Sequence, residues 1–561
     1  MAPPVWNHDA SRKVDSLLVA NIAKLLFDLG FSLELFRSAL SPRRRLLREL
    51  RSAWAQRGTK DHFLASRYFD RTRRKSPASH VDDKTWVDLE FPSVFADVDT
   101  TITPIGSQVL FKGLRTYADA PGELNERYGV YAALRADQAL REEVQLVLTH
   151  LRADSNAYLA DYLFGEAPYT PTYFAPVLLW SLVSIAVLAG VVAAGWPIWI
   201  WFAIVGINVT VILRVSRHVN RDAEALKACA RLLGVAERLS AMRTAKPIPA
   251  LARLAQQVPR RAEARRAIRW FSLQQTNELG ASLVLWLNLG FLLELLTYIY
   301  AAKKLARFRT DLASTYELVG SLDAAVAVAS FLERHPDHCQ PVIASGALIV
   351  VDDGYHPLID RPVKNSIRLD GRSALITGSN MAGKTTFIKM IGLNVIFGRT
   401  LGFCLASKAA FPPSVVRAVI RGEHSVESGR SHYFAEIEAI LSLIDSARQG
   451  GSHVFLIDEL FSGTNTVERI AAARAVLKSI SANAQVLVTT HDVELQALLG
   501  ERFELYHFRE DPDVKGFFDY RLRLGRATER NAIRLLARMG FPDDVVNDAL
   551  AFSAEEGNFE T

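Results

Sequence analysis

Apolar and polar positions follow three different patterns along the 561 residues of this chain. Residues 1–80 and 214–275 have the apolar spacing and the scarcity of glycine that are typical of helices. Between them lies a long apolar run, Pro176–Leu213, without any ionisable residue. From about Ala344 onwards, short β-branched runs (ALIVV, SALITG, HVFLID, QVLVTT) alternate with helical stretches. The last pattern predicts a parallel sheet flanked by helices.

The apolar run predicts a helical hairpin. It is broken once, at Gly195-Trp196-Pro197, and one bilayer crossing needs roughly 17 to 25 apolar residues. Two short crossings joined by a tight turn therefore fit its length. Arg214, Arg217 and Arg221 follow at once, which favours a cytoplasmic location for both ends of the hairpin. The alternative is a buried hairpin inside a large helical domain, although soluble core helices usually keep a polar stripe.

A third apolar stretch, Leu279–Ala302, is long enough to span a bilayer but contains Asn288 and Glu294. An ionised carboxylate near the bilayer centre costs roughly 2.5 kcal/mol or more. This favours a buried or interfacial helix over a third crossing.

Composition sets broad limits. The length suggests several domains, and the net charge of +6 suits nucleic acid or anionic lipid equally. The three cysteines, Cys229, Cys339 and Cys404, are far apart, so neither a disulfide framework nor a structural zinc site is expected. Residues 1–10 do not have the pattern of a cleaved signal peptide.

A nucleotide site is predicted where the run SALIT meets a helical stretch. The intervening residues fit G-x-x-x-x-G-K-[ST], in which backbone N–H groups and a helix N-terminus surround phosphates. In this motif Lys384 reaches the β and γ oxygens and Thr385 ligates Mg²⁺. The predicted ATP-binding residues here are Gly378, Ser379, Asn380, Met381, Ala382, Gly383, Lys384, Thr385 and Thr386.

Two later runs end in residues that suit phosphoryl transfer. The run HVFLID is followed by an acid, so Asp458 is expected to hold Mg²⁺ through its water shell and Glu459 to orient or deprotonate the attacking water. The run QVLVTT ends before His491. A histidine at the carboxyl edge of such a sheet lies where ligands bind, so His491 is expected to sense the γ-phosphate or to contact adenine.

These residues resemble the MutS family of mismatch-repair ATPases. The phosphate loop is similar to that family's G-x-N-M-x-G-K-[ST], and the segment from Ser428 to Ser431 resembles its signature segment. The resemblance implies a homodimer with a composite ATP site, in which Ser431 reaches the nucleotide of the opposite subunit. Tyr355-His356-Pro357 with Asn365 resembles the entry to the family's ATPase domain, and Asn365 is added to the nucleotide-binding residues on that ground.

The resemblance extends beyond the ATPase region. Arg526–Asn547 is similar to the family's C-terminal helix-turn-helix, and Asp99–Leu114 looks like the opening of its core domain. Nothing recognisable as a mismatch-recognition domain lies ahead of residue 85, and an apolar hairpin is foreign to repair MutS proteins. Phe461-Ser462 stands where the family usually has Gly-Arg. The chain therefore looks like a membrane-associated branch, for which the family implies DNA as a partner.

The expected fold is a mainly α-helical core and lever region with a transmembrane hairpin, followed by an α/β P-loop domain and a C-terminal helix-turn-helix. The expected function is a dimeric MutS-like ATP hydrolase that uses ATP and Mg²⁺ and couples hydrolysis to DNA. The alternative is a membrane-anchored, ATP-driven scaffold that binds no DNA. The expected location is a membrane, with the ATPase domain facing the cytoplasm, and the alternative is the cytoplasm. The expected segments are a basic helical region (1–84), a core-like module (85–173), the hairpin (174–213), lever-like helices (214–338), the ATPase domain (339–525) and a dimerisation segment (526–561).

Overall fold

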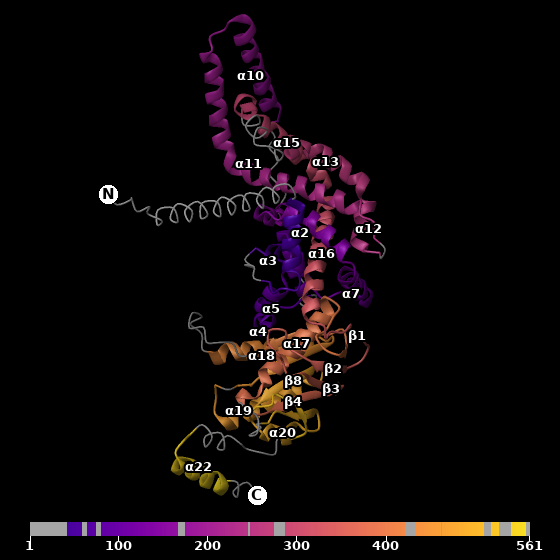
Figure 1. Cartoon of the computed structure of the whole chain (residues 1–561). Coiled ribbons are helices and arrows are strands. Elements are labelled where there is room, and N and C mark those ends of the chain that lie inside the picture. Colours follow the sequence, from indigo (N-terminus) through magenta and orange to yellow (C-terminus); the bar gives the residue numbers. More distant parts are fainter. Residues whose placement is uncertain are drawn as a thin grey trace, which may run out of the picture.

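The computed structural model describes residues 42–58, 64–73, 80–165, 174–244, 247–273, 286–420, 432–461, 463–509, 518–526 and 540–556. The described helices and strands form an elongated arrangement. An α-helical hairpin lies at one end, a helical bundle in the middle and an α/β part at the other end (Figure 1). The predicted order of the helical and α/β regions is therefore confirmed.

The helical bundle packs around one long helix, α16 (Arg309–Arg334), which is buried along most of its length. The helices packed with it, directly or through one neighbour, include α2 (Pro42–Ala53), α3 (Ser66–Thr72), α4 (Asp83–Asp88), α5 (Phe91–Val98), α6 (Pro104–Arg115), α7 (Pro121–Ala136), α8 (Gln138–Leu148), α9 (Leu159–Phe164), α12 (Pro249–Gln256) and α13 (Val258–Leu273). Thr103 caps α6 by accepting a hydrogen bond from Gly106 N. Asp323 of α16, fully buried, accepts hydrogen bonds from Ile102 N and Thr103 N. A buried carboxylate thus locks the start of α6 to α16.

The hairpin consists of α10 (Phe174–Ala194) and α11 (Trp199–Ser240). Only 11% of the most apolar window of α10 is buried. Helix α11 continues through the predicted hairpin end at residue 213 to Ser240, so one helix joins the apolar arm to the bundle (Figure 1).

The described part of the third apolar stretch lies against the hairpin and the bundle. It is helical from residue 286 to 291, breaks at Leu292, where φ is 51°, and resumes as α15 (Leu293–Leu305). Tyr298, Ile299 and Ala302 of α15 are buried. The second helix long and apolar enough to cross a membrane, Leu295–Arg334, is 83% buried in its most apolar window. The expectation of a buried helix therefore agrees with the described residues.

The α/β part contains two sheets. The larger has the order β10-β9-β4-β8-β7-β6, and all its pairings are parallel except that of β10 with β9. Its strands are β4 (Ser373–Thr377), β6 (Val415–Val419), β7 (His453–Asp458), β8 (Gln485–Thr490), β9 (Phe503–His507) and β10 (Arg523–Leu524). The smaller sheet, in the order β1-β5-β2-β3, contains β1 (Val342–Ile343), β2 (Leu348–Gly354), β3 (Asn365–Asp370) and β5 (Lys408–Phe411).

One predicted strand was assigned to the wrong sheet. The run ALIVV forms β2, which pairs antiparallel with β3 and β5 in the smaller sheet. A parallel pair needs a long crossover connection, whereas only residues 355–364 separate β2 from β3. The runs SALIT, HVFLID and QVLVTT do lie together in the parallel sheet, as β4, β7 and β8.

Successive side chains of β7 point to opposite faces of the larger sheet. Val454 and Leu456 belong to the core shared with α17 (Lys384–Thr400) and the helical bundle. Phe455 and Ile457 belong to a second core. That core is completed by α18 (His432–Arg448), α19 (Thr466–Ile480) and α20 (Glu494–Leu499). This period of two is what a strand buried on both faces requires.

An aromatic cluster joins the P-loop helix to the bundle. The ring of Phe331, near the end of α16, lies 6.2 Å from that of Phe397 of α17 and 6.0 Å from that of Phe403. Phe397 and Phe403 stack at 5.1 Å. All three side chains are at most 1% exposed.

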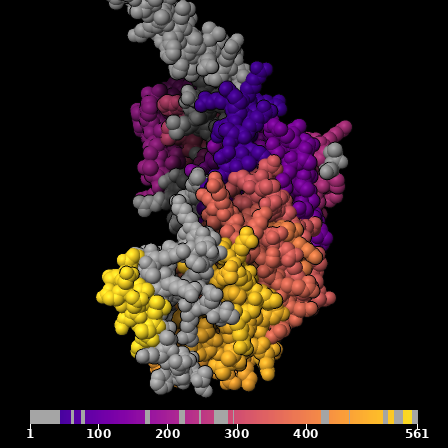
Figure 2. Space-filling model, turned by 60° about the horizontal axis from the view of Figure 1, so that its bottom comes forward, coloured from indigo at the N-terminus to yellow at the C-terminus, as the bar shows by residue number. Residues whose placement is uncertain are grey.

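At the C-terminus, helix α22 (Asp543–Glu556) forms a lobe at the edge of the α/β part (Figure 2, yellow). Most of the predicted helix-turn-helix lies outside the described residues.

Candidate functional site

The loop between β4 and α17 has the shape of a phosphate-binding loop. Gly378 and Gly383 have φ values of 142° and 97°, which favour glycine. A Cβ at Gly378 would lie 2.7 Å from the carbonyl oxygen of Phe508, so a larger residue does not fit there. Helix α17 begins directly after Gly383 and directs its N-terminal positive potential at the loop.

Lys384 is buried beneath this loop. Its Nζ donates to the carbonyl oxygen of Gly378 at 2.5 Å and lies 3.9 Å from Glu459 Oε1. Burial lowers the pKa of Lys384, while the charges of Glu459 and Asp458 oppose that shift. A cation held inside the loop by these groups suits an incoming polyphosphate.

The acid at the end of β7 contacts the start of α17. Thr385 Oγ1 donates to Asp458 Oδ2 at 2.8 Å, and Thr489 Oγ1 donates to Asp458 Oδ1. A hydroxyl and a carboxylate form the kind of oxygen ligand set that Mg²⁺ prefers. Ser379 Oγ, in the same loop, is buried and has no hydrogen-bond partner in the part of the chain that the structure describes. The residues present therefore fit a bound Mg²⁺–nucleotide, which would supply both a metal and a further acceptor.

Glu459 occupies a left-handed turn directly after β7, with φ of 51°. Its backbone N–H donates to the carbonyl oxygen of Thr489 at 3.1 Å, and its Oε1 lies 3.5 Å from His491 Nδ1. Two residues on, Phe461 N donates to Glu436 Oε1 of α18 at 2.5 Å. Contacts from β8 and α18 thus hold a conformation that costs of order 1 to 3 kcal/mol in a non-glycine residue.

An ion pair not predicted from the sequence supports His491. Arg469 Nε and Nη2 donate to Asp492 at 3.0 and 2.6 Å, and Asp492 Oδ1 lies 3.8 Å from His491 Nε2. This hydrogen bond raises the pKa of Arg469. The sequence signal for this ion pair was weak: Asp492 stands next to His491, but Arg469 resembles any charged residue on a helix.

A cavity of about 480 Å³ opens beside the loop. Its lining includes Met381, Thr385, Thr386, Asn365, His356 and Tyr520. The Asn365 amide group donates to the carbonyl oxygen of Tyr520 at 2.9 Å and accepts from Leu522 N at 2.8 Å. Asn365 therefore lies at the predicted site and also holds one wall of the cavity in place.

The structure brings Lys384, Thr385, Asp458, Glu459 and His491 together from the start of α17 and the ends of β7 and β8. Ser431 lies outside the described residues, as does the side chain of Asn380. The contact of Ser431 across a dimer stays a prediction.

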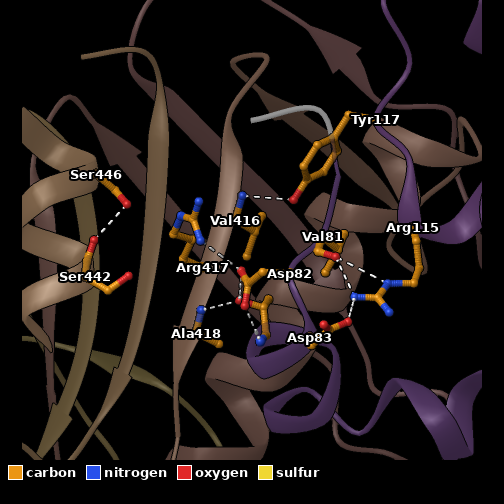
Figure 3. Close-up of polar contacts among 11 residues, drawn as sticks. Val81, Asp82, Asp83, Arg115, Tyr117, Val416, Arg417, Ala418, Ser442 and Ser446 are labelled. Atoms are coloured by element: carbon orange, nitrogen blue, oxygen red, sulfur yellow. Dashed lines mark hydrogen bonds and ion pairs between the residues drawn. The ribbon is translucent and has the colours of Figure 1, made fainter. Parts of the chain in front are cut away.

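The strand that leads toward Ser431 is held by the helical bundle. At the edge of the sheet, alternate N–H groups of β6 and of the residue after it donate to bundle side chains. These bonds are Val416 N to Tyr117 Oη (3.1 Å), Ala418 N to Thr85 Oγ1 (3.0 Å) and Ile420 N to Asp88 Oδ2 (2.8 Å). Figure 3 shows the bonds of Val416 and Ala418. Asp82 adds an ion pair with Arg417 at 3.2 Å. A sheet edge open to pairing is thus covered by side chains.

Comparison with known proteins identifies the α/β part. Residues 374–555 match the MutS domain V family. This part of the chain is homologous to MutS and MutS2 proteins. Domain V is the ATPase domain of that family, which agrees with the loop and acid geometry described above.

Three similar proteins each match less than half of this chain. An endonuclease MutS2 of Pelotomaculum thermopropionicum is 30% identical over 260 residues, which are 45% of this chain and 32% of that protein. An endonuclease MutS2 of Thermus thermophilus is 32% identical over 252 residues, 44% of this chain and 33% of that protein. A DNA mismatch repair protein MutS of Natronomonas pharaonis is 29% identical over 247 residues, 42% and 28% of the two chains. The chain spans about a third of the length of these relatives.

Proposed function

We propose that this protein is a MutS-type ATP hydrolase that binds ATP with Mg²⁺ between the phosphate loop and the end of β7. The observation that carries the proposal is the 2.8 Å contact of Thr385 with Asp458, next to a lysine buried under the loop. Thr385 would bind Mg²⁺ directly and Asp458 through water. The metal would neutralise charge on the β- and γ-phosphate oxygens.

The remaining groups supply positioning and proton transfer. Lys384 exchanges its contact with the Gly378 carbonyl oxygen for the phosphate oxygens, where its charge stabilises the transferring group. Glu459 accepts a hydrogen bond from the attacking water. It takes the proton of that water as the water oxygen bonds to the γ-phosphorus and the bond from this phosphorus to the departing ADP oxygen breaks. His491, fixed between Glu459 and Asp492, holds that carboxylate in place.

The test is retention of labelled ATP with Mg²⁺ by the purified full chain. Lys384→Ala should abolish retention, because it removes the buried cation. Lys389→Ala is the matched control: it lies on the same helix but pairs with Glu90 at 2.7 Å, away from the loop. Failure of the wild-type chain to retain ATP would overturn the proposal, as would equal retention by the Lys384 variant.

We further propose that two copies form the active unit, with Ser431 completing the partner's site. Residues 421–431 connect β6 to α18. Glu436 of α18 accepts a hydrogen bond from Phe461 N in the turn after Glu459, so the start of α18 lies close to the acidic turn. Closure of two such sites would couple ATP binding to movement of the helical bundle.

The α10–α11 hairpin is proposed to anchor the protein in a membrane. At 1.5 Å per residue the 21 residues of α10 span about 31 Å, which matches a hydrocarbon core of about 30 Å. Large apolar side chains are exposed along both arms, for example Leu179 at 65% and Phe202 at 64%. Arg214 and the arginines after it favour a cytoplasmic side for the bundle and the ATPase domain.

Polar side chains within the hairpin find partners inside the protein. Trp180 Nε1 donates to Asn208 Oδ1 at 2.7 Å, and Asn208 Nδ2 donates to the carbonyl oxygens of Leu289 and Gly290, each at 2.9 Å. Ser181 Oγ donates to the carbonyl oxygen of Phe291 at 2.8 Å. These side chains also satisfy the carbonyl groups freed by the break at Leu292. Such internal pairing is what a bilayer demands of polar groups.

Membrane anchoring is tested by fractionating cells and washing the membranes with alkaline carbonate. The wild-type chain should stay in the membrane fraction. The double variant Leu179→Arg with Phe202→Arg should leave that fraction, since each arginine in the bilayer costs roughly 2.5 kcal/mol or more. Val87→Arg, at a 63% exposed position of the bundle, is the control and should stay. Extraction of the wild-type chain by carbonate would rule out the anchor.

DNA is the proposed partner to which ATP hydrolysis is coupled. Relatives carry the names DNA mismatch repair protein and endonuclease, and the net charge of this chain is +6. The exposed hairpin favours the alternative, a membrane-anchored scaffold that moves a protein or the bilayer. A shift assay with duplex, mismatched and branched DNA separates the two. Binding through phosphates must weaken steeply as salt rises, and the absence of any shift at low salt would exclude the DNA role.

A further inference from the structure

A second pocket with a basic lining lies far from the ATP site, between the later part of α11 and α13. It measures about 440 Å³ and is lined by Leu233, Glu237, Val258, Arg261, Ala262, Arg265 and Arg266. Helix α13 lies beside the base of the hairpin (Figure 1) and packs against both α11 and α15.

Arg261 is the unusual residue of this pocket. It is only 6% exposed, yet among the described residues its Nε and Nη1 have no hydrogen-bond partner. Its Nη2 donates to the carbonyl oxygen of Leu254, and burial lowers the pKa of Arg261. A buried guanidinium without a counter-ion is costly. Unsatisfied buried groups of this kind point to a missing ligand, ion or water.

The charged residues around Arg261 do not neutralise the positive charge of its guanidinium group. Arg265, one helical turn later, pairs with Glu237 of α11. Arg266 lines the same pocket and, among the described residues, has no ion pair. The pocket lining therefore carries three arginines and one carboxylate, and its net positive charge is open to an anion. The small side chain of Ala262 keeps space between the arginines, and Leu233 and Val258 add an apolar wall.

We propose that this pocket binds a phosphate group, carried either by an anionic lipid headgroup or by a soluble phosphate. Arginine is suited to this ligand because several N–H groups can bind the phosphate oxygens at once. The position beside the hairpin brings a headgroup within reach if the hairpin enters a bilayer, so the lipid source alone rests on the proposed anchor. The site is independent of ATP hydrolysis.

The experiment uses the full chain in detergent micelles, with ADP and Mg²⁺ added to saturate the P-loop. Phosphatidylglycerol, phosphatidylcholine and inorganic phosphate are titrated separately, and the midpoint of thermal unfolding reports binding. Arg261→Met should weaken binding about tenfold or more, since it removes a charged hydrogen-bond donor but keeps the aliphatic stem. Arg243→Gln removes the same charge from an exposed position outside the pocket and should leave affinity within about twofold.

Each outcome decides the proposal. Saturable binding of phosphatidylglycerol but not phosphatidylcholine assigns a lipid headgroup, and saturable binding of inorganic phosphate alone assigns a soluble ligand. Equal affinities of the wild type and Arg261→Met would overturn the site. Saturation by none of the three probes would do the same. If Arg261→Met does not fold, Ala262→Leu, which fills the pocket and keeps every arginine, must reduce the same binding.

Discussion

Thr85→Val tests whether the bundle holds the edge strand β6. Thr85 is 1% exposed, and its Oγ1 accepts the hydrogen bond from Ala418 N at 3.0 Å. Valine has nearly the same shape but no hydroxyl group. The substitution leaves a buried N–H group unsatisfied while changing the packing very little. It also removes the bond from Thr85 Oγ1 to Asp82 Oδ2 at 2.7 Å.

The magnitude follows from the cost of that N–H group. An unsatisfied buried donor costs about 1 to 3 kcal/mol, so local opening of β6 should become about 5- to 150-fold more frequent. Hydrogen exchange measured by mass spectrometry on peptides covering residues 415–420 should accelerate by that factor. The ATP-binding loop should keep its wild-type exchange rate, because Thr85 does not touch it.

The matched control is Thr315→Val. Thr315 is also fully buried in a helix, but its hydroxyl donates only to the carbonyl oxygen of Asp311, one turn earlier. The exchange of residues 415–420 should not change in this variant. Unchanged exchange in Thr85→Val, or equal acceleration in both variants, would refute the idea that side-chain acceptors of the bundle hold β6.

Three further results are expected. Glu459→Gln should retain ATP but release phosphate about 100-fold or more slowly, and wild-type turnover would refute its role. Ser431→Ala and Lys384→Ala should each be inactive alone, and mixing them should restore phosphate release, since one intact composite site forms in the mixed dimer; no recovery would speak against a shared site. Burial lowers the pKa of His356 to about 4, below the unfolded value of about 6.5. The folded state therefore binds fewer protons than the unfolded state. The contribution of His356 to the free energy of unfolding is fully present above pH 6.5 and is lost as the pH falls from 6.5 toward 4. The loss at pH 5 is about 2 kcal/mol, and denaturant midpoints of His356→Gln should show a weaker decline.

The proposed catalytic cluster was predictable because its residues follow strand ends. In a parallel sheet the carboxyl ends of β4, β7 and β8 meet at one edge, so Lys384, Asp458 and His491 converge wherever the strands are assigned correctly. The hydrogen bonds that hold β6 to the helical bundle were not predictable from the sequence. Its acceptors, Thr85 and Asp88, lie more than 300 residues away in sequence, and neither belongs to a motif.

The length of a helix and the pairing of a strand were harder to predict than the residues of the candidate site. Apolar composition located the hairpin, but α11 continues to Ser240 because its later half packs into the bundle. The pairing of β2 depended on a short connection to β3, whereas the periodicity of its residues alone could not separate a parallel from an antiparallel partner.

The aromatic cluster at the end of α16 would transmit a movement of α17 to the helical bundle. Phe397 lies on α17, the helix that begins at the Gly378–Gly383 loop, and Phe331 lies on α16, a helix of 26 residues that reaches back toward the apolar arm. Packed interiors are stiff, so a shift of the P-loop helix cannot be absorbed where these rings meet. If the chain hydrolyses ATP and the hairpin enters a membrane, as proposed above, displacement of α17 at one end of the molecule would tilt the hairpin at the other end within the bilayer.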